Sequence, residues 1–148
     1  MMTPAEFVTR VAEWVAAVNR GSLDLPDGIL HRDAVFRLNG TAYEDTLGRP
    51  ANDPLVRLVA RGPGGYRLLL KALQYTLGSP AIALRDFEIR SGLGTGHVDI
   101  QGTLRDDGAA WTGSADIVMT VDVDGRVTEL AVQMDATSVA RLMQARTA

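Results

Sequence analysis

The sequence contains no cysteine, a single lysine and only two histidines in 148 residues. Without cysteine the chain can form no disulfide, no thiolate nucleophile and no cysteine-bound metal site. His31 and Asp33 are too few to hold zinc, so we expect no metal. No apolar run is long enough to cross a membrane, and the first residues lack the apolar core of a signal peptide. A cytoplasmic protein without membrane partners is therefore the default prediction.

The chain also has no excess of positive charge. The 15 basic and 18 acidic residues give a net charge of −3, so the long-range field does not favour nucleic acid. The preference for arginine over lysine, with abundant alanine and glycine, indicates the codon usage of a GC-rich bacterium. The length and the 46% hydrophobic content predict one domain, residues 1–148, around a single core.

Three glycine-containing motifs look like ligand sites but lack the residues that such sites need. "DVDG" at 122–125 has no closing glutamate of a calcium loop, so a hairpin turn is expected. "GLGTG" at 92–96 is flanked by strands, whereas a dinucleotide site needs a strand, a turn and a helix. "GPGG" at 62–65 lacks the lysine of a phosphate loop and more simply joins two helices. We therefore expect no nucleotide and no other cofactor.

The order of the predicted elements indicates an α+β domain. "TPAE" at 3–6 is a capping box, and apolar residues follow it at helical spacing as far as Gly21. Further helices are predicted after Asp53 and over 66–77, with a loop and a short helix over 22–31 and an irregular segment over 41–53. Strands are predicted at 33–38, 82–90, 96–104, 111–122 and 126–134, and a last short helix is capped by Asp135 or Thr137. Helices followed by an antiparallel meander are typical of the α+β class.

The stretch "GTGHVDIQG" at 94–102 is the most informative for function. Polar and apolar residues alternate in it, so His97, Asp99 and Gln101 share one face of a strand. That face is either the wall of a pocket or a solvated or dimer-facing surface, and the alternation alone leaves both open. Within an apolar pocket an ionised Asp99 would need a partner. The candidates are His97, Arg85, Arg90 and Tyr43.

Three longer phrases resemble a known superfamily. They are "VAEWVAAVNRGSLD" at 11–24, "HRDAVFRLNG" at 31–40 and "VDVDGRVTELAVQMD" at 121–135. In this order they resemble the superfamily of nuclear transport factor 2, ketosteroid isomerase, limonene epoxide hydrolase and the SnoaL-like polyketide cyclases. The resemblance implies a cone-shaped domain, in which a curved, mainly antiparallel sheet wraps over N-terminal helices around an internal pocket. It also implies a homodimer formed through the outer face of the sheet.

The same resemblance implies which residues face the pocket. The Arg-x-Asp pair of limonene epoxide hydrolase falls on His97-Val98-Asp99, which places His97 and Asp99 inside. The implied substrate-binding wall consists of Trp14, Phe36, Leu38, Ile117, Met119 and Val132. The outer face then carries Asp116, Thr120, Glu129 and Gln133. Tyr43, Tyr66 and Tyr75 are more simply packing residues, although Tyr43 lies in the loop expected over the mouth of the pocket.

These implications lead to one main functional hypothesis and two alternatives. The main one is a cofactor-independent cyclase or isomerase of bacterial secondary metabolism, acting on a hydrophobic, oxygenated molecule of polyketide or terpenoid type. His97 would move the proton, Asp99 would orient His97, and Tyr43 would donate to a developing oxyanion. The first alternative is a non-catalytic carrier or partner subunit, which a pocket with His97 outside it would favour. The second is an epoxide hydrolase, weakened because Leu38 and Val132 replace its polar residues.

Overall fold

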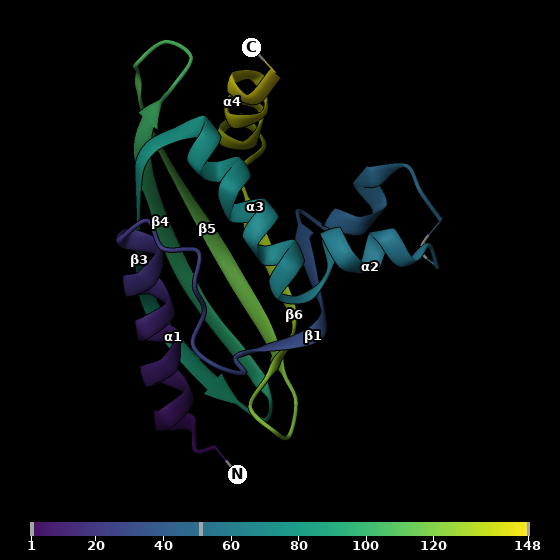
Figure 1. The fold of residues 1–148 in the computed structure, drawn as a ribbon. Coiled ribbons are helices and arrows are strands. Elements are labelled where there is room, and N and C mark those ends of the chain that lie inside the picture. The colour runs from purple at the N-terminus through teal and green to yellow at the C-terminus, as the bar shows by residue number, and fades with distance from the viewer. Residues whose placement is uncertain (1, 51, 148) are drawn as a thin grey trace.

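Two long helices lie on one face of a curved sheet in the computed structural model, which describes residues 2–50 and 52–147 (Figure 1). The elements in chain order are α1 (Pro4–Asn19), β1 (Leu30–Leu38), β2 (Thr41–Ala42), the 3-10 helix η1 (Tyr43–Leu47), α2 (Pro54–Ala60), α3 (Gly62–Thr76), β3 (Leu77–Arg90), β4 (Leu93–Leu104), β5 (Ala110–Val121), β6 (Val127–Met134) and α4 (Ala136–Thr147). α1 and α3 cover the concave face, α2 projects to one side, and the two ends of the chain lie at opposite ends of the molecule.

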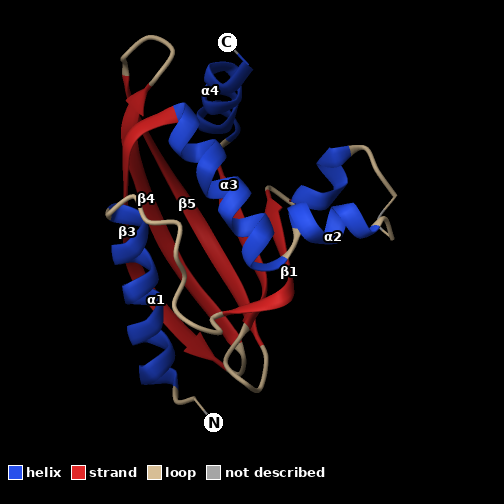
Figure 2. Ribbon diagram, viewed as in Figure 1, coloured by secondary structure: helices blue, strands red, loops and turns tan. Residues whose placement is uncertain are grey.

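The sheet has six strands in the order β2-β1-β6-β5-β4-β3 and is not closed into a barrel. β3 to β6 form an antiparallel meander. β6, the last strand in the chain, also pairs in parallel with β1, the first (Figure 2). This arrangement confirms the predicted α+β class and the curved, mainly antiparallel sheet. The Asp122–Gly125 segment is a hairpin turn, as predicted, with the backbone N–H of Asp122 donating to the carbonyl of Arg126 at 2.9 Å.

The ends of α1 fix its position against the sheet. Thr3 Oγ1 accepts a hydrogen bond from the backbone N–H of Glu6 at 3.1 Å, which confirms the predicted cap. At the other end Asn19 Oδ1 accepts a hydrogen bond from the backbone N–H of Ile82 on β3 at 2.7 Å, and Asn19 Nδ2–H donates to the carbonyl of Ile82 at 2.9 Å. Asn19 therefore holds β3 where its pairing with β4 shifts register.

Three local predictions are wrong. Residues 22–29 form a loop that leads into β1 and contain no helix. The "GPGG" segment is the first turn of α3 rather than a break before it. Its glycines allow close contact, because a Cβ at Gly62 would lie 2.1 Å from the carbonyl oxygen of Arg32 and one at Gly65 would lie 2.6 Å from the carbonyl carbon of Ala60. The segment over 41–53 also contains β2 and η1, where an irregular chain was expected.

The core consists of two clusters. The larger lies between α1, α3 and the sheet and includes Phe7, Trp14 and Ile117. The smaller lies under α4 and is centred on Leu77 and Trp111, with Val139 and Leu142 of α4 packed against it. Asp135 caps α4 as predicted, since its carboxylate accepts from the backbone N–H of Ser138 at 2.9 Å. Leu73 and Val132 pack against both clusters, which join there.

Candidate ligand cavity and the outer face

An apolar cavity of about 190 Å³ lies between α1, α3 and the concave face of the sheet. Its lining includes Val11, Trp14 and Val18 of α1, Tyr66 and Leu70 of α3, and Leu84, Val98, Ile117, Met119, Leu130 and Val132 of the sheet. The surface that it presents is entirely apolar. Small-molecule sites are mostly apolar concavities of this kind, with few polar groups.

The strands present these side chains because of their pairing. Val98 on β4 lies opposite Leu84 on β3 and Ala115 on β5, so all three point to the same face. Ile117 lies opposite Val132 on β6 in the same way. The apolar half of each alternating strand therefore faces α1 and α3, and the cavity lies over β3 to β6.

Trp14 and Tyr66 join the two helices across the cavity lining. The indole Nε1–H of Trp14 donates to the hydroxyl of Tyr66 at 2.9 Å, and the two rings meet edge to face with centroids 5.5 Å apart. Burial raises the pKa of Tyr66, although the hydrogen bond from Trp14 acts in the opposite direction. Tyr66 is therefore protonated at neutral pH. It is the one residue with a titratable side chain among those that line the cavity.

Four of the six residues predicted to form the pocket wall line the cavity. They are Trp14, Ile117, Met119 and Val132. Phe36 is instead buried in the larger core cluster, and Leu38 is only half-buried, so neither belongs to the lining. Both lie on β1, which is one strand beyond β6 and thus beyond the cavity.

The prediction that His97 and Asp99 face the pocket is wrong. The side chain of His97 is 50% exposed on the outer face of the sheet, where its Nδ1 is hydrogen-bonded to Asp116 Oδ1. His97 and Asp116 are directly opposed on β4 and β5, so they must share a face. Asp116 is exposed, as predicted, together with Thr120 and Gln133, while Glu129 is half-buried and paired with Arg37. The polar side chains of the alternating segment on β4 therefore lie on the solvated face of the sheet.

Asp99 has a partner, and it is Arg85, one of the predicted candidates. Arg85 Nε and Nη2 donate to the Asp99 carboxylate at 2.6 and 3.2 Å, and Ser114 Oγ donates to it at 2.7 Å. The hydrogen bonds from Arg85, and then from Ser114, lower the pKa of Asp99. The carboxylate therefore remains ionised and is a weak base.

Open depressions of about 560 and 380 Å³, lined by both polar and apolar atoms, lie on this outer face, one beside Asp99 and the other beside His97. Both exceed the cavity in volume, but each exposes ionisable side chains, which suit hydration better than a hydrophobic ligand. The cavity is therefore the better candidate site.

Tyr43 begins η1, is half-buried and packs against the larger core cluster without lining the cavity. The structure thus does not bring His97, Asp99 and Tyr43 together in the cavity. Their catalytic roles remain predictions. Tyr75 is 83% exposed and packs little, contrary to expectation, whereas Tyr66 is 8% exposed.

Comparisons with known proteins place the fold. No family model matches the chain, and no curated protein matches it in sequence. An LEH-like epoxide hydrolase of M. tuberculosis is 16% identical with a TM-score of 0.65, over 95% of this chain and 91% of that one. The epoxide hydrolase/cyclase-like enzyme SalBIII is 15% identical with a TM-score of 0.66, over 93% and 97%. An NTF2-like protein of unknown function from Exiguobacterium sp. 255-15 is 12% identical with a TM-score of 0.60, over 88% and 98%.

The chain has the fold of the nuclear transport factor 2-like and SnoaL-like superfamily. This confirms the fold that the three sequence phrases imply. The described residues include no group of three histidine, aspartate or glutamate side chains placed to hold a metal. No helix in the described ranges is long and apolar enough to span a membrane.

Proposed function

We propose that this protein binds a small hydrophobic molecule in the cavity between α1, α3 and the sheet. The observation that carries the proposal is the wholly apolar surface of that cavity. Removing apolar ligand surface from water is worth roughly 25 cal/mol per Å². A dry cavity of about 150 Å³ lined by similar side chains is known to accept benzene. At about 190 Å³, this cavity suits a molecule of one substituted ring.

A second candidate is cyclisation or isomerisation of such a molecule, of polyketide or terpenoid type and without a cofactor. The fold supports this candidate, because the similarly folded enzyme SalBIII is described as having a role in pyran ring formation. Rigid walls that hold a flexible substrate folded bring its reacting atoms together. The position of His97 outside the cavity nevertheless favours binding over acid/base catalysis. We do not propose epoxide hydrolysis, which would require a carboxylate beside a water molecule, because the lining residues include no carboxylate.

The proposal is tested by filling the cavity. Ala115 lies on its wall and is 4% exposed, so Ala115→Leu would occupy space that the ligand needs. Ala12→Leu adds the same atoms to the exposed side of α1 and serves as the matched control. The hydrocarbon α-methylstyrene, titrated by NMR, is expected to bind saturably to the wild type and to Ala12→Leu. Its affinity for Ala115→Leu should fall at least about 10-fold, which corresponds to 1.4 kcal/mol. Equal affinity for all three proteins, or no binding to any, would contradict the proposal.

We also propose that two copies of the chain associate through the outer face of the sheet. Acidic and basic side chains form ion pairs there, Arg37 with Glu129 and Arg85 with Asp99. A two-fold contact places the same patch against itself, and a patch with both signs of charge is complementary to itself. Light scattering at micromolar concentration should give the mass of a dimer, and a monomeric mass would remove this proposal.

A further inference from the structure

One end of the cavity and α4 share a set of side chains. Four residues that line the cavity also belong to the smaller core cluster or pack against it: Leu73, Ile100, Ala115 and Val132. Val139, Leu142 and Ala145 of α4 pack against the same cluster. α4 therefore helps to keep this end of the cavity closed, at the opposite end of the molecule from the start of α1 (Figure 1).

The other boundaries of the cavity are held by hydrogen bonds and aromatic packing. The strands β3 to β6 form its floor through their pairing. Asn19 joins the end of α1 to β3, and Trp14 joins α1 to α3. Toward the start of α1 the core is filled by Phe7 and Phe87, with ring centroids 6.2 Å apart. α4 can move without breaking any of these contacts.

α4 is held to the rest of the molecule less firmly than α1 or α3. It is the last element of the chain, so a single connection at Asp135 joins it to β6. Residues 136–145 include no buried side chain, whereas α1 and α3 each contribute several. Segments with few buried apolar contacts open at free energies well below that of global unfolding. α4 is therefore suited to open while the rest of the fold stays intact.

Arg141 joins α4 to the turn between β4 and β5. Its guanidinium donates to both carboxylate oxygens of Asp106 at 3.1 and 3.2 Å and to Asp107 at 2.8 Å. The turn is itself fixed, because Arg105 Nε donates to the carbonyl of Gln74 on α3 at 2.7 Å. The side chains of Arg141 and Asp106 are 29% and 19% exposed, so water screens this pair only partly. These ion pairs hold a lightly packed helix against a fixed turn.

We infer that α4 is the gate of the cavity: the bound molecule enters and leaves when α4 moves away from the smaller cluster, and Arg141 holds the gate closed. This inference rests on the proposed binding function. No described residue of α4 lines the cavity, so the bound molecule makes the same contacts with or without the Arg141 ion pairs. Weakening these pairs therefore makes the cavity open more often and leaves the affinity constant. The association and dissociation rates should change by the same factor.

Hydrogen exchange of the free protein measures whether α4 opens by itself. The backbone N–H groups of residues 140–145 should be protected at least about 10-fold less than those of β5, because they exchange by local opening. Equal protection of α4 and β5 would mean that α4 opens only when the whole domain unfolds. That result would overturn the inference.

Arg141→Ala tests the gate through the exchange of a bound probe. Both rate constants for α-methylstyrene are obtained from the NMR line shapes of the Val98 and Ile117 methyl groups, which line the cavity. Both should rise about 2- to 5-fold, the range for loss of an ion pair near the surface, with an unchanged dissociation constant. Arg49→Ala removes a similar ion pair, with Asp53 at 2.8 Å beside α2, and should change neither rate. Unchanged rates in Arg141→Ala would overturn the inference and leave the proposed function intact.

A cross-link between α4 and the turn should have the opposite effect. Because the chain has no cysteine, Asp106→Cys combined with Arg141→Cys supplies the only two thiols. Joining them with a short bis-maleimide should slow both association and dissociation of α-methylstyrene below the rates of the same protein before joining, with the affinity unchanged. Rates that stay the same after joining would overturn the inference. Failure of α-methylstyrene to bind the wild type would instead contradict the proposed function, and this inference with it.

Discussion

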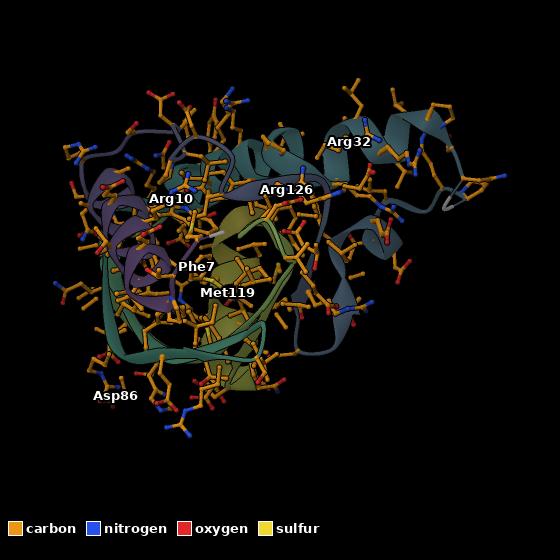
Figure 3. All side chains as sticks on the ribbon, turned by 90° about the horizontal axis from the view of Figure 1, so that it is seen from below. Phe7, Arg10, Arg32, Asp86, Met119 and Arg126 are labelled. Atoms are coloured by element: carbon orange, nitrogen blue, oxygen red, sulfur yellow. The ribbon has the colours of Figure 1, made fainter. Side chains whose placement is uncertain are left out.

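The ring of Phe87 should make alanine destabilising at Gly94 and Gly96, two glycines of the "GLGTG" segment. β3 shifts register between Arg85 and Glu88, and Asp86 takes a left-handed conformation there with φ of 55°. Phe87 therefore packs into the core, with its ring 6.2 Å from that of Phe7. Figure 3 shows Phe7 and Met119 inside the fold and Asp86 outside it. This ring lies over the backbone of Gly94 and Gly96, which explains these two glycines without any nucleotide.

The distances set the size of the effect. A Cβ at position 94 would lie 2.9 Å from Cζ and 3.3 Å from Cε2 of Phe87, both at the far end of the ring. A Cβ at position 96 would lie 3.1 Å from Cδ2 and 3.2 Å from Cα of Phe87, and 3.3 Å from the carbonyl oxygen of Arg85. Overpacking of this kind costs about 1–3 kcal/mol. For a chain of this length each kcal/mol lowers Tm by about 2–4 °C.

Thermal unfolding of Gly94→Ala and Gly96→Ala, each alone and combined with Phe87→Leu, tests this reasoning. Leucine lacks the far end of the ring, so in the Phe87→Leu background Gly94→Ala should cost little further stability. Gly96→Ala should remain destabilising, because its neighbours include backbone atoms that leucine does not remove. A Gly94→Ala protein as stable as the wild type, or equal rescue of both variants, would refute the packing argument.

The hydrogen bonds of single side chains give further predictions. Asn19→Ala should lower the free energy of unfolding by about 1–3 kcal/mol in a denaturant titration, because both bonds to the Ile82 backbone are lost; a loss below about 0.5 kcal/mol, the range of ordinary surface substitutions, would contradict this. Arg141 donates to both carboxylate oxygens of Asp106 at 3.1 and 3.2 Å and lowers its pKa. The stability from this pair is present above the ordinary carboxyl pKa and is lost as pH falls through the lowered value. Arg141→Ala should therefore flatten the acid side of the stability–pH curve, and an unchanged acid side would argue against the pair. His97→Ala should keep the affinity for α-methylstyrene within about 2-fold, as expected of a surface change, and a larger loss would show that the outer face matters for binding.

The sequence was sufficient for the order of the longer helices and strands but not for which face of the sheet is buried. The alternation around His97 and Asp99 shows that they share a face, as they do. It contains no information about which face is buried, and an alignment that is wrong by one residue moves every side chain to the opposite face. The pairing with Asp116, which was itself expected outside, decides the question. The register between two strands depends on the hairpin that connects them, and the pattern along one strand does not predict it.

Tyr66 illustrates a second limit of the sequence, which does not predict contacts between residues far apart in the chain. A tyrosine on an amphipathic helix looks like any packing residue, and its partner Trp14 is 52 positions away. The contact arises because α1 and α3 meet over the same cavity, which no local signal predicts. Trp14 itself was predicted correctly, because its helical spacing and the resemblance both placed it inside.

The most direct test of the central claim is to locate a bound probe. Methyl resonances of Val98 and Ile117 report on the cavity, whereas the imidazole resonance of His97 reports on the outer face of the same strands. On titration with α-methylstyrene we expect the Val98 and Ile117 methyl groups to shift and saturate together while His97 stays unchanged. Shifts at His97 with unmoved Val98 and Ile117 methyl groups would contradict the claim that the cavity is the binding site.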